Sequence, residues 1–284
     1  MTTLTEKELI KWAQSEESIE ALVLVGSRGT CQRVDTLSDY DLAVFCNSSE
    51  PYIKSDRWIS HIARVWIWIP ESFMCEETLI PTRLVIFEGG VKVDFAFYPF
   101  EMLQKMTREG KLPQGFDCGY KVLLDKKNLT KNIPQPSGTG FQIPLPSEKE
   151  FTDLVREFWF EIYHVTKYIK RHDLWSVKFR MGGIYDRYLI KMICWNETSK
   201  GKATHSLGKH LSSWADPKIL KALDNVFGHF DADDSQKALF ATIDLFRNLS
   251  KETASKLNLV YPSEPDRSLT QFIQDLLWAP KKIL

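Results

Sequence analysis

The sequence predicts an α+β first half joined to an all-α second half. Before residue 100, short apolar runs alternate with polar residues, which is typical of strands. From Lys126 to Pro146 the chain is rich in Pro, Gly and Asn and has no sustained period, which is typical of a linker. Beyond this stretch apolar residues recur at helical spacing. The expected parts are a sheet-containing domain over 1–130, a linker over 131–146 and a helical domain over 147–284.

In the first half, the elements follow from capping and alternation patterns. Thr5 and Glu8 form a capping-box pattern ahead of an amphipathic run, which predicts a helix to about residue 18. The predicted strands are 21–25, 39–45 and 63–69, followed by a hairpin over 82–99 that turns at Gly89-Gly90.

The second half contains a helix-start pattern at each of several positions. Ser147 and Glu150 form another capping box, and helical periodicity then continues to Ile169. A second helical segment is expected after Gly182-Gly183, and Asp216-Pro217 combines a capping residue with proline at the first helical position. Further helices near 217–227, 235–257 and 268–278 would complete a bundle.

Composition indicates a globular protein that binds small ligands. The chain has 284 residues, of which 43% are hydrophobic and 26% charged, and Lys plus Arg and Asp plus Glu number 37 each. This balance gives no overall field to attract nucleic acid, so no nucleic-acid partner is expected. The polar beginning and the absence of an apolar run of about eighteen residues predict no membrane association and a cytoplasmic location.

The cysteines predict no metal centre. Their number is odd and no C-x-x-C or zinc-finger spacing occurs. We therefore expect reduced and mostly buried thiols at Cys31, Cys46, Cys75, Cys118 and Cys194.

Two aspartates interrupt a predicted strand. Asp39 and Asp41 are two residues apart, so their carboxylates project from one face with Cα atoms roughly 6.5 to 7 Å apart. Such close like charges are costly unless a cation lies between them, and Mg²⁺ commonly binds one or two carboxylates together with substrate phosphates. The alternative is that Asp39 caps a turn and Asp41 faces solvent from an edge strand.

Two further features favour a nucleotide site. The turn at Gly26-Ser27 follows the preceding strand and is separated from Asp39 by eleven residues, and its free backbone N–H groups could hold a triphosphate. A third carboxylate, Asp94, lies within the strand VKVDFAF, away from its large apolar residues. Neither a dinucleotide-binding pattern nor a P-loop pattern is present.

Together these residues resemble a known superfamily. Gly-Ser, a loop of ten to a dozen residues, Asp-x-Asp, and a third acidic residue on a separate strand are the signature of the nucleotidyltransferases that include DNA polymerase beta. In the second half, LPSEKEFTDLVREFWFEIYHVTKYIKRHDLW, YDRYLIKMICWN and SLGKHL resemble the helical domain of the aminoglycoside 6-adenylyltransferases, the streptomycin adenylyltransferase family. The chain departs from the family pattern after Arg28, where an Asn is expected and Gly29-Thr30-Cys31 occurs.

The resemblance implies a nucleotidyltransferase mixed sheet with flanking helices, a C-terminal helical bundle and AMP transfer from ATP to a hydroxyl of an aminoglycoside. ATP is then the co-substrate, and two Mg²⁺ ions stabilise the attacking and leaving oxygens. Asp39 and Asp41 would hold both ions, while Asp94 would complete the metal site or accept the hydroxyl proton. Gly26, Ser27 and Arg28 would contact the phosphates.

The helical half is expected to complete both binding sites. Candidates for binding the triphosphate are Lys191, Lys202 and Lys209, although a lysine is more often a solvated surface residue. The acceptor is a polycation, so its pocket needs carboxylates and aromatic faces. The candidates are Glu157, Glu161, Trp159 and Trp175, with core packing as the alternative for both tryptophans. A monomer or a homodimer is compatible with these features.

Two other functions compete with antibiotic adenylylation. A nucleotidyltransferase could modify a protein or an RNA end, as in toxin–antitoxin pairs, but the balanced charge argues against RNA. A nucleotide-binding regulatory module that has lost catalysis is the other possibility, and the presence of all three aspartates argues against it.

Overall fold

Two units make up the chain, and each has its own internal packing. The computed structural model describes residues 4–30, 34–140, 142–205 and 208–278. The first unit comprises Met1–Phe141 and the second Gln142–Leu284. The boundary between them falls within the segment predicted as a linker.

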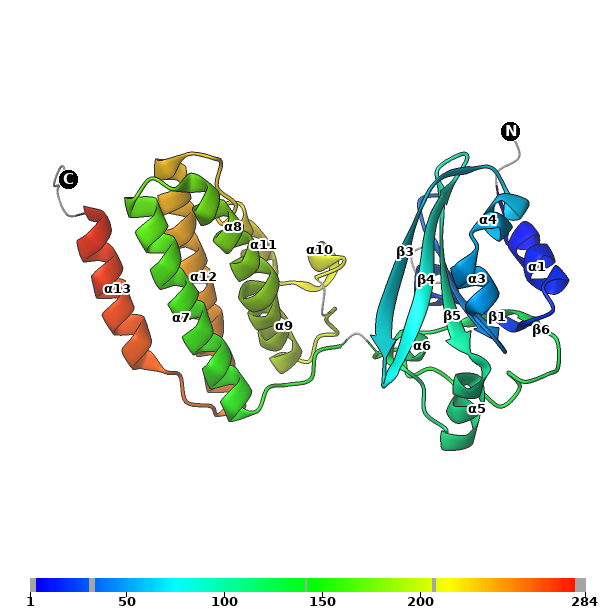
Figure 1. Ribbon diagram of the computed structural model, residues 1–284. Helices are drawn as coiled ribbons and strands as arrows, with labels where there is room; N and C mark the ends of the chain where they lie inside the picture. The colour runs from blue at the N-terminus through cyan, green and yellow to red at the C-terminus, as the bar shows by residue number, and fades with distance from the viewer. Residues whose placement is uncertain (1–3, 31–33, 141, 206–207, 279–284) are drawn as a thin grey trace. The chain divides into compact units, whose positions relative to one another are not determined.

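A six-stranded mixed sheet forms the centre of the first unit, with the strand order β3-β4-β5-β2-β1-β6 (Figure 1). The strands are β1 (Ile19–Val25), β2 (Tyr40–Cys46), β3 (Val65–Cys75), β4 (Thr78–Phe87), β5 (Val91–Pro99) and β6 (Lys121–Asp125). Strands β2 and β5 run parallel, and the other neighbouring strands run antiparallel. All strands predicted from the sequence are present, whereas β6 was not predicted.

Helices cover both faces of this sheet. One face carries α1 (Glu6–Ser15), α3 (Glu50–Lys54) and α4 (Arg57–Ile62), and the other carries α5 (Phe100–Glu109) and α6 (Gln114–Asp117). The first face is packed by aromatic rings, because Trp12 of α1 stacks on Trp58 of α4 with their ring centroids 5.0 Å apart. Each face therefore has a core of its own.

The local patterns predicted for this unit are confirmed. Thr5 and Glu8 form the capping box at the start of α1. Gly89 and Gly90 both have positive φ values, of 88° and 77°, and the N–H of Gly90 donates to the carbonyl of Phe87 at 3.0 Å. This backbone is the turn that joins β4 to β5.

Helices and their connecting segments make up the described part of the second unit, which contains no strand. The helices are α7 (Glu148–Lys170), α8 (Leu174–Ile184), the π-helical segment η1 (Tyr185–Leu189), α9 (Ile190–Ser199), α10 (Leu211–Trp214), α11 (Pro217–Leu223), α12 (Ala232–Leu257) and α13 (Ser263–Trp278). Apolar side chains from these helices share one core, in which the rings of Phe158 and Phe246 stack with centroids 3.6 Å apart. None of the helices in the described part of the chain is long and apolar enough to span a membrane.

Helix starts in this unit follow the predicted caps, but one predicted break is wrong. The side chain of Ser147 accepts a hydrogen bond from the N–H of Glu150, and that of Asp216 accepts one from the N–H of Lys218. The segment expected to begin after Gly182-Gly183 begins earlier, at Leu174, and the helix runs through both glycines. Packing of its apolar residues in the bundle core outweighs the low helix propensity of glycine.

Candidate active site

Asp41 and Asp94 lie side by side at the start of two parallel strands. They are direct register partners on β2 and β5, so their side chains project from the same face of the sheet. Asp39 comes just before β2 and projects from that face as well. The register thus brings together the three aspartates that the sequence singled out.

Lys92 provides a positive charge among these carboxylates. Its Nζ lies 2.7 Å from Oδ2 of Asp94 and 3.1 Å from Oδ2 of Asp39. Lys92 precedes Asp94 by two residues on β5, so both side chains leave the strand on one face. Sequence reasoning missed this residue, although its alternation with Val91 and Val93 was the available signal.

The surroundings of Asp94 raise the pKa of its carboxyl. Burial raises the pKa of the Asp94 carboxyl, and the charges of Asp39 and Glu71 add to this effect, so the contacts with Lys92 do not restore the ordinary value. Burial alone would lower the pKa of Lys92, but its hydrogen bonds to Asp94 and Asp39 raise it. Oδ1 of Asp94 is buried and has no hydrogen-bond partner among the described residues. An oxygen of this kind is suited to a cation or to a substrate proton.

Gly26 and Gly29 allow the chain to turn closely against these strands. Gly26 has a φ of 63°, and a Cβ there would overlap the carboxylate of Asp41. A Cβ on Gly29 would lie 2.5 Å from the carbonyl oxygen of Leu24. The predicted loop here is a short helix, α2 (Gly26–Thr30), which begins beside Asp41.

Arg28 ties this turn to the start of β2. Its Nε donates to the carbonyl of Ser38 at 2.9 Å, and its guanidinium lies 4.1 Å from the centre of the Tyr40 ring. Ser27 is half-buried in the same turn. Three of the predicted phosphate-binding residues, Gly26, Ser27 and Arg28, therefore border the aspartates.

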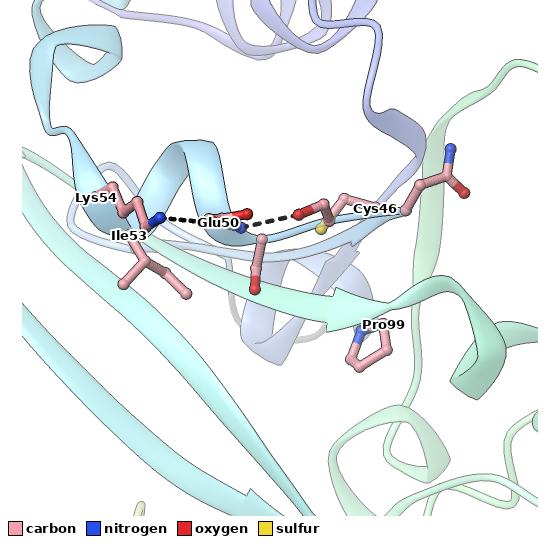
Figure 2. A pocket seen from close by; sticks show the side chains of 8 residues that line it. Cys46, Glu50, Ile53, Lys54 and Pro99 are labelled. Carbon is pink, nitrogen blue, oxygen red and sulfur yellow. Dashed lines mark hydrogen bonds and ion pairs between the residues drawn. The ribbon is translucent and has the colours of Figure 1, made fainter.

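A different hollow, of about 390 Å³, lies at the other end of these strands (Figure 2). It is lined by Cys46 and Pro99, which pair at the ends of β2 and β5, and by residues of α3. These positions are five residues beyond Asp41 and Asp94, roughly 16 Å along the strands. Glu50 and Lys54 pair with each other at its rim, and burial raises the pKa of the Cys46 thiol to about 12. This hollow is therefore separate from the carboxylate site.

The oxygen atoms of these carboxylates are of the type that binds a divalent cation, but in this structure the Lys92 ammonium balances part of their charge. Among the described residues no group of three or more His, Cys, Asp or Glu side chains is arranged to hold a metal ion. Instead, the Lys92 ammonium lies against Asp39 and Asp94. The unpartnered oxygen of Asp94 and the adjacent carboxylate of Asp41 offer the ligand type that magnesium prefers.

The family of the chain is decided by comparison with known proteins. The family model described as streptomycin adenylyltransferase matches residues 3–276, nearly the whole chain. The chain belongs to the streptomycin adenylyltransferase family. It is thereby a member of a nucleotidyltransferase enzyme family, as the resemblance of its motifs predicted.

The names of two relatives agree with this assignment. The aminoglycoside 6-adenylyltransferase of Bacillus subtilis is 25% identical, and the alignment covers 96% of each chain. That of Campylobacter jejuni is 25% identical over 91% of each chain. A crystal structure of an aminoglycoside 6-adenyltransferase from Bacillus subtilis aligns with 97% of this chain and 99% of its own, at a TM-score of 0.48 and 21% identity.

The three lysines of the helical unit differ in their surroundings. Lys202 and Lys200 both pair with Glu197, whose side chain is fully buried. Nζ of Lys191 lies 4.9 Å from the centre of the Trp195 ring. Lys209 is exposed. Sequence reasoning missed Glu197 as the buried partner of Lys202.

The two tryptophans predicted to contact the acceptor differ in their burial. Trp159 is fully buried in the bundle core, so the expectation that it contacts the acceptor is corrected in favour of core packing. Trp175 is 76% exposed and lines a shallow hollow of about 300 Å³ with Tyr168, Phe179 and other residues. Helical periodicity alone could not separate these two tryptophans.

The two glutamates on α7 also differ. Glu161 pairs with Arg180, with Oε2 and Nη1 2.7 Å apart, and Arg180 lines the hollow beside Trp175. Glu157 is exposed one turn earlier on the same helix. Both carboxylates lie near Tyr188, where their charges add to the effect of burial in raising the pKa of its hydroxyl.

Proposed function

We propose that this protein transfers AMP from ATP to a hydroxyl group of an aminoglycoside of the streptomycin type, with Mg²⁺ as the metal. The observation that supports this most directly is the pairing of Asp41 with Asp94 on β2 and β5, beside the Gly26-Ser27 turn. The family match over residues 3–276 and the names of the relatives support the same donor and acceptor.

The donor site would be formed by the turn and the aspartates. Asp39 and Asp41 would hold Mg²⁺, with Asp94 as a further ligand or as the proton acceptor. Backbone N–H groups of Gly26 and Ser27 would donate to the β- and γ-phosphates, with Arg28 nearby as a cation. Two bound Mg²⁺ ions would supply charge stabilisation at the attacking and leaving oxygens. Lys191, Lys202 and Lys209 remain the proposed phosphate contacts of the helical unit.

The reaction would be an in-line substitution at the α-phosphorus. The acceptor hydroxyl oxygen forms a bond to this phosphorus while the bond to the bridging oxygen of pyrophosphate breaks. The hydroxyl proton passes to a carboxylate, and Asp94 is suited to receive it because burial raises the pKa of its carboxyl. The protein itself mainly positions charge around the reacting phosphate.

The acceptor would be recognised through its positive charges. Glu157 and Trp175 are exposed and offer a carboxylate and an aromatic face, which suit a guanidinium or ammonium group. Glu161 already pairs with Arg180, so an acceptor cation would have to compete with that guanidinium. We therefore favour Glu157 over Glu161 as the acceptor carboxylate of the helical unit.

A transfer assay tests the proposal directly. Purified protein, Mg²⁺ and ATP labelled at the α-phosphate are incubated with a panel of aminoglycosides that includes streptomycin, and labelled adenylylated product is measured. We expect product with streptomycin and none with Asp41→Asn, because that variant loses a metal ligand. Asp153→Asn, on the exposed surface of α7, is the matched control and keeps activity. Absence of product with every aminoglycoside would contradict the proposal.

A further inference from the structure

The sheet face that carries the aspartates continues across β4 and β3. Asp94 is the register partner of Leu84 on β4, and Leu84 is the register partner of Ile69 on β3. Paired residues project from the same face, so Asp41, Asp94, Leu84 and Ile69 form one continuous row. Ile67 occupies the preceding row, which leads through Ile86 to Lys92.

Glu71 lies in the next row on this face. This row runs from Ala43 through Ala96 and Thr82 to Glu71 on β3. Glu71 is exposed and makes no hydrogen bond or ion pair within the described part of the chain. A carboxylate that holds no structural contact, at the border of the candidate active site, is free to bind a ligand.

Burial changes systematically along this face. In the row beyond Glu71, Phe45, Tyr98 and Ile80 are buried in the core beneath α5. Closer to the aspartates this face is more exposed to solvent: on β3, Ile67 is 56% exposed and Ile69 is 51% exposed. Ile69 and Leu84 form an apolar surface between Glu71 and Asp94, and Ile67 extends this surface toward the row of Lys92.

An additional β-strand is a poor occupant for this surface. Strand β3 is the edge of the sheet, and Pro70 in its middle lacks the N–H that a further strand would need. Charge at the Glu71 end favours a cationic ligand, because that carboxylate is exposed and has no ion pair among the described residues, whereas Asp94 at the other end already contacts Lys92. Apolar side chains in between can contact the carbon-bearing faces of sugar rings.

We infer that this surface binds the acceptor, with Glu71 pairing with a cationic group of a hydroxylated polycation whose reacting hydroxyl is at Asp94. Glu71 lies two strands and two residues from Asp94, so their Cα atoms are about 12 Å apart by strand geometry. A molecule of linked sugar rings can bridge that span. The inference rests on the proposed function and adds a binding residue to it.

Steady-state kinetics with streptomycin and ATP test this role. Glu71→Gln keeps the shape of the side chain and removes its charge, and an exposed ion pair of modest strength predicts a KM for streptomycin about threefold to fivefold higher. Glu71→Lys should raise this KM further by repulsion. We expect unchanged kcat and unchanged KM for ATP, because Glu71 binds neither the donor nor the reacting atoms.

Glu77→Gln is the matched control, since it removes one charge from the turn between β3 and β4. Its KM for streptomycin should equal that of the wild type.

A second measurement is the dependence of the KM for streptomycin on salt concentration. This dependence should be weaker in Glu71→Gln than in the wild type, because an ion pair is lost. A wild-type KM for streptomycin in both Glu71 variants would overturn the inference while leaving the proposed function intact. Failure of the wild type to adenylylate any aminoglycoside would overturn both.

Discussion

At the scale of single residues, Lys92 balances the negative charge of the candidate active site. Three carboxylates gather at the start of β2 and β5, and Lys92 compensates two of them. Its ammonium contacts the carboxylates of Asp39 and Asp94, which are also the proposed ligands of Mg²⁺. Metal binding would therefore require Lys92 to move away or to contact phosphate instead, so the lysine and the metal compete.

Replacing Lys92 should expose this competition. In Lys92→Gln the carboxylates lose their cation, so Mg²⁺ should bind roughly 5- to 30-fold more tightly, corresponding to one or two kcal/mol. Titration calorimetry with MgCl₂ in the absence of nucleotide measures the affinity. Lys105→Gln is the control, because Lys105 pairs with Glu76 on the surface at 2.6 Å. Equal Mg²⁺ affinities in the two variants would contradict competition at this site.

Gly26 combines a special backbone conformation with a close contact, and the two effects can be separated. Gly26→Ala should destabilise the fold by about 1–2 kcal/mol because of its positive φ and should also displace Asp41. Gly110 has the same φ of 63° but no neighbour at the Cβ position, so Gly110→Ala carries only the backbone cost. We expect both variants to lose unfolding free energy in urea, with the larger loss in Gly26→Ala because it also carries the clash with Asp41, and a loss of transfer on the order of a hundredfold only for Gly26→Ala. Similar turnover in both would show that Asp41 tolerates the shift.

At this scale the sequence predicted which aspartates belong together but not what surrounds them. Alternation within a strand assigns a residue to a face, so Asp39, Asp41 and Asp94 could be selected. Alternation also assigns Lys92 to the face of Asp94, but its contact with Asp39 depends on strand register, which is a tertiary property. The same limit applies to Trp159 and Trp175, because helical periodicity alone left both residues open to core packing or to a pocket.

Among the elements, α13 is held to α12 by a buried ion pair. Arg247 of α12 contacts Asp266 of α13 with Nη2 and Oδ1 2.8 Å apart, and the Tyr261 hydroxyl donates to Asp266 at 2.9 Å. Burial alone would raise the pKa of the Asp266 carboxyl, but the hydrogen bonds from Arg247 and Tyr261 and the nearby positive charges lower it. The ionised carboxylate is thus the form that attaches α13.

Removing the charge of Asp266 should therefore destabilise the helical unit. Breaking one partner of a buried pair costs about 3 kcal/mol or more, so Asp266→Asn should unfold at lower urea concentration. Glu264→Gln is the matched control, because Glu264 lies in the same first turn of α13 but is exposed, and it should change stability little. Equal midpoints for the two variants would contradict a structural role for the pair.

The same contact predicts a dependence on acid. Because the pKa of Asp266 is lowered by folding, its contribution is fully present above the unfolded value of about 3.9 and is lost as the pH falls below it toward the folded value. The melting temperature of the wild type should therefore fall more steeply between about pH 4 and pH 2 than that of Asp266→Asn. Parallel curves in calorimetry would rule out this residue as a source of acid sensitivity.

Elements with strong local patterns were predictable, and those stabilised by packing were not. The capping boxes at Thr5 and Ser147 and the Gly89-Gly90 turn fix their backbones locally. In contrast, the helix through Gly182-Gly183 and the π-helical segment after it depend on the bundle core. Strand β6 is short and only partly buried, so its alternation is weak.

On the scale of the whole molecule, each buried apolar cluster among the described residues draws its members from a single unit. The buried clusters of the first unit contain no residue beyond Ile133, and that of the second begins at Phe151. Helices of the first unit cover part of each face of its sheet, and in the second unit the other long helices pack on α7 and α12. Each unit thus has the requirements of an independently folding domain.

Separate expression should test this independence. The fragment 142–284 should be helical by circular dichroism and should unfold cooperatively, because its core comes entirely from its own helices. A fragment beginning at residue 152 lacks the Ser147 capping box and the buried Phe151, and it should melt at lower temperature, since a helix cap alone contributes about 1 kcal/mol. The fragment 1–141 should likewise retain its sheet, because the clusters on both of its faces lie within it. A non-cooperative transition in 142–284 would show that folding depends on contacts beyond those that this core provides, and equal melting temperatures for the two helical fragments would show that the cap and Phe151 add little stability.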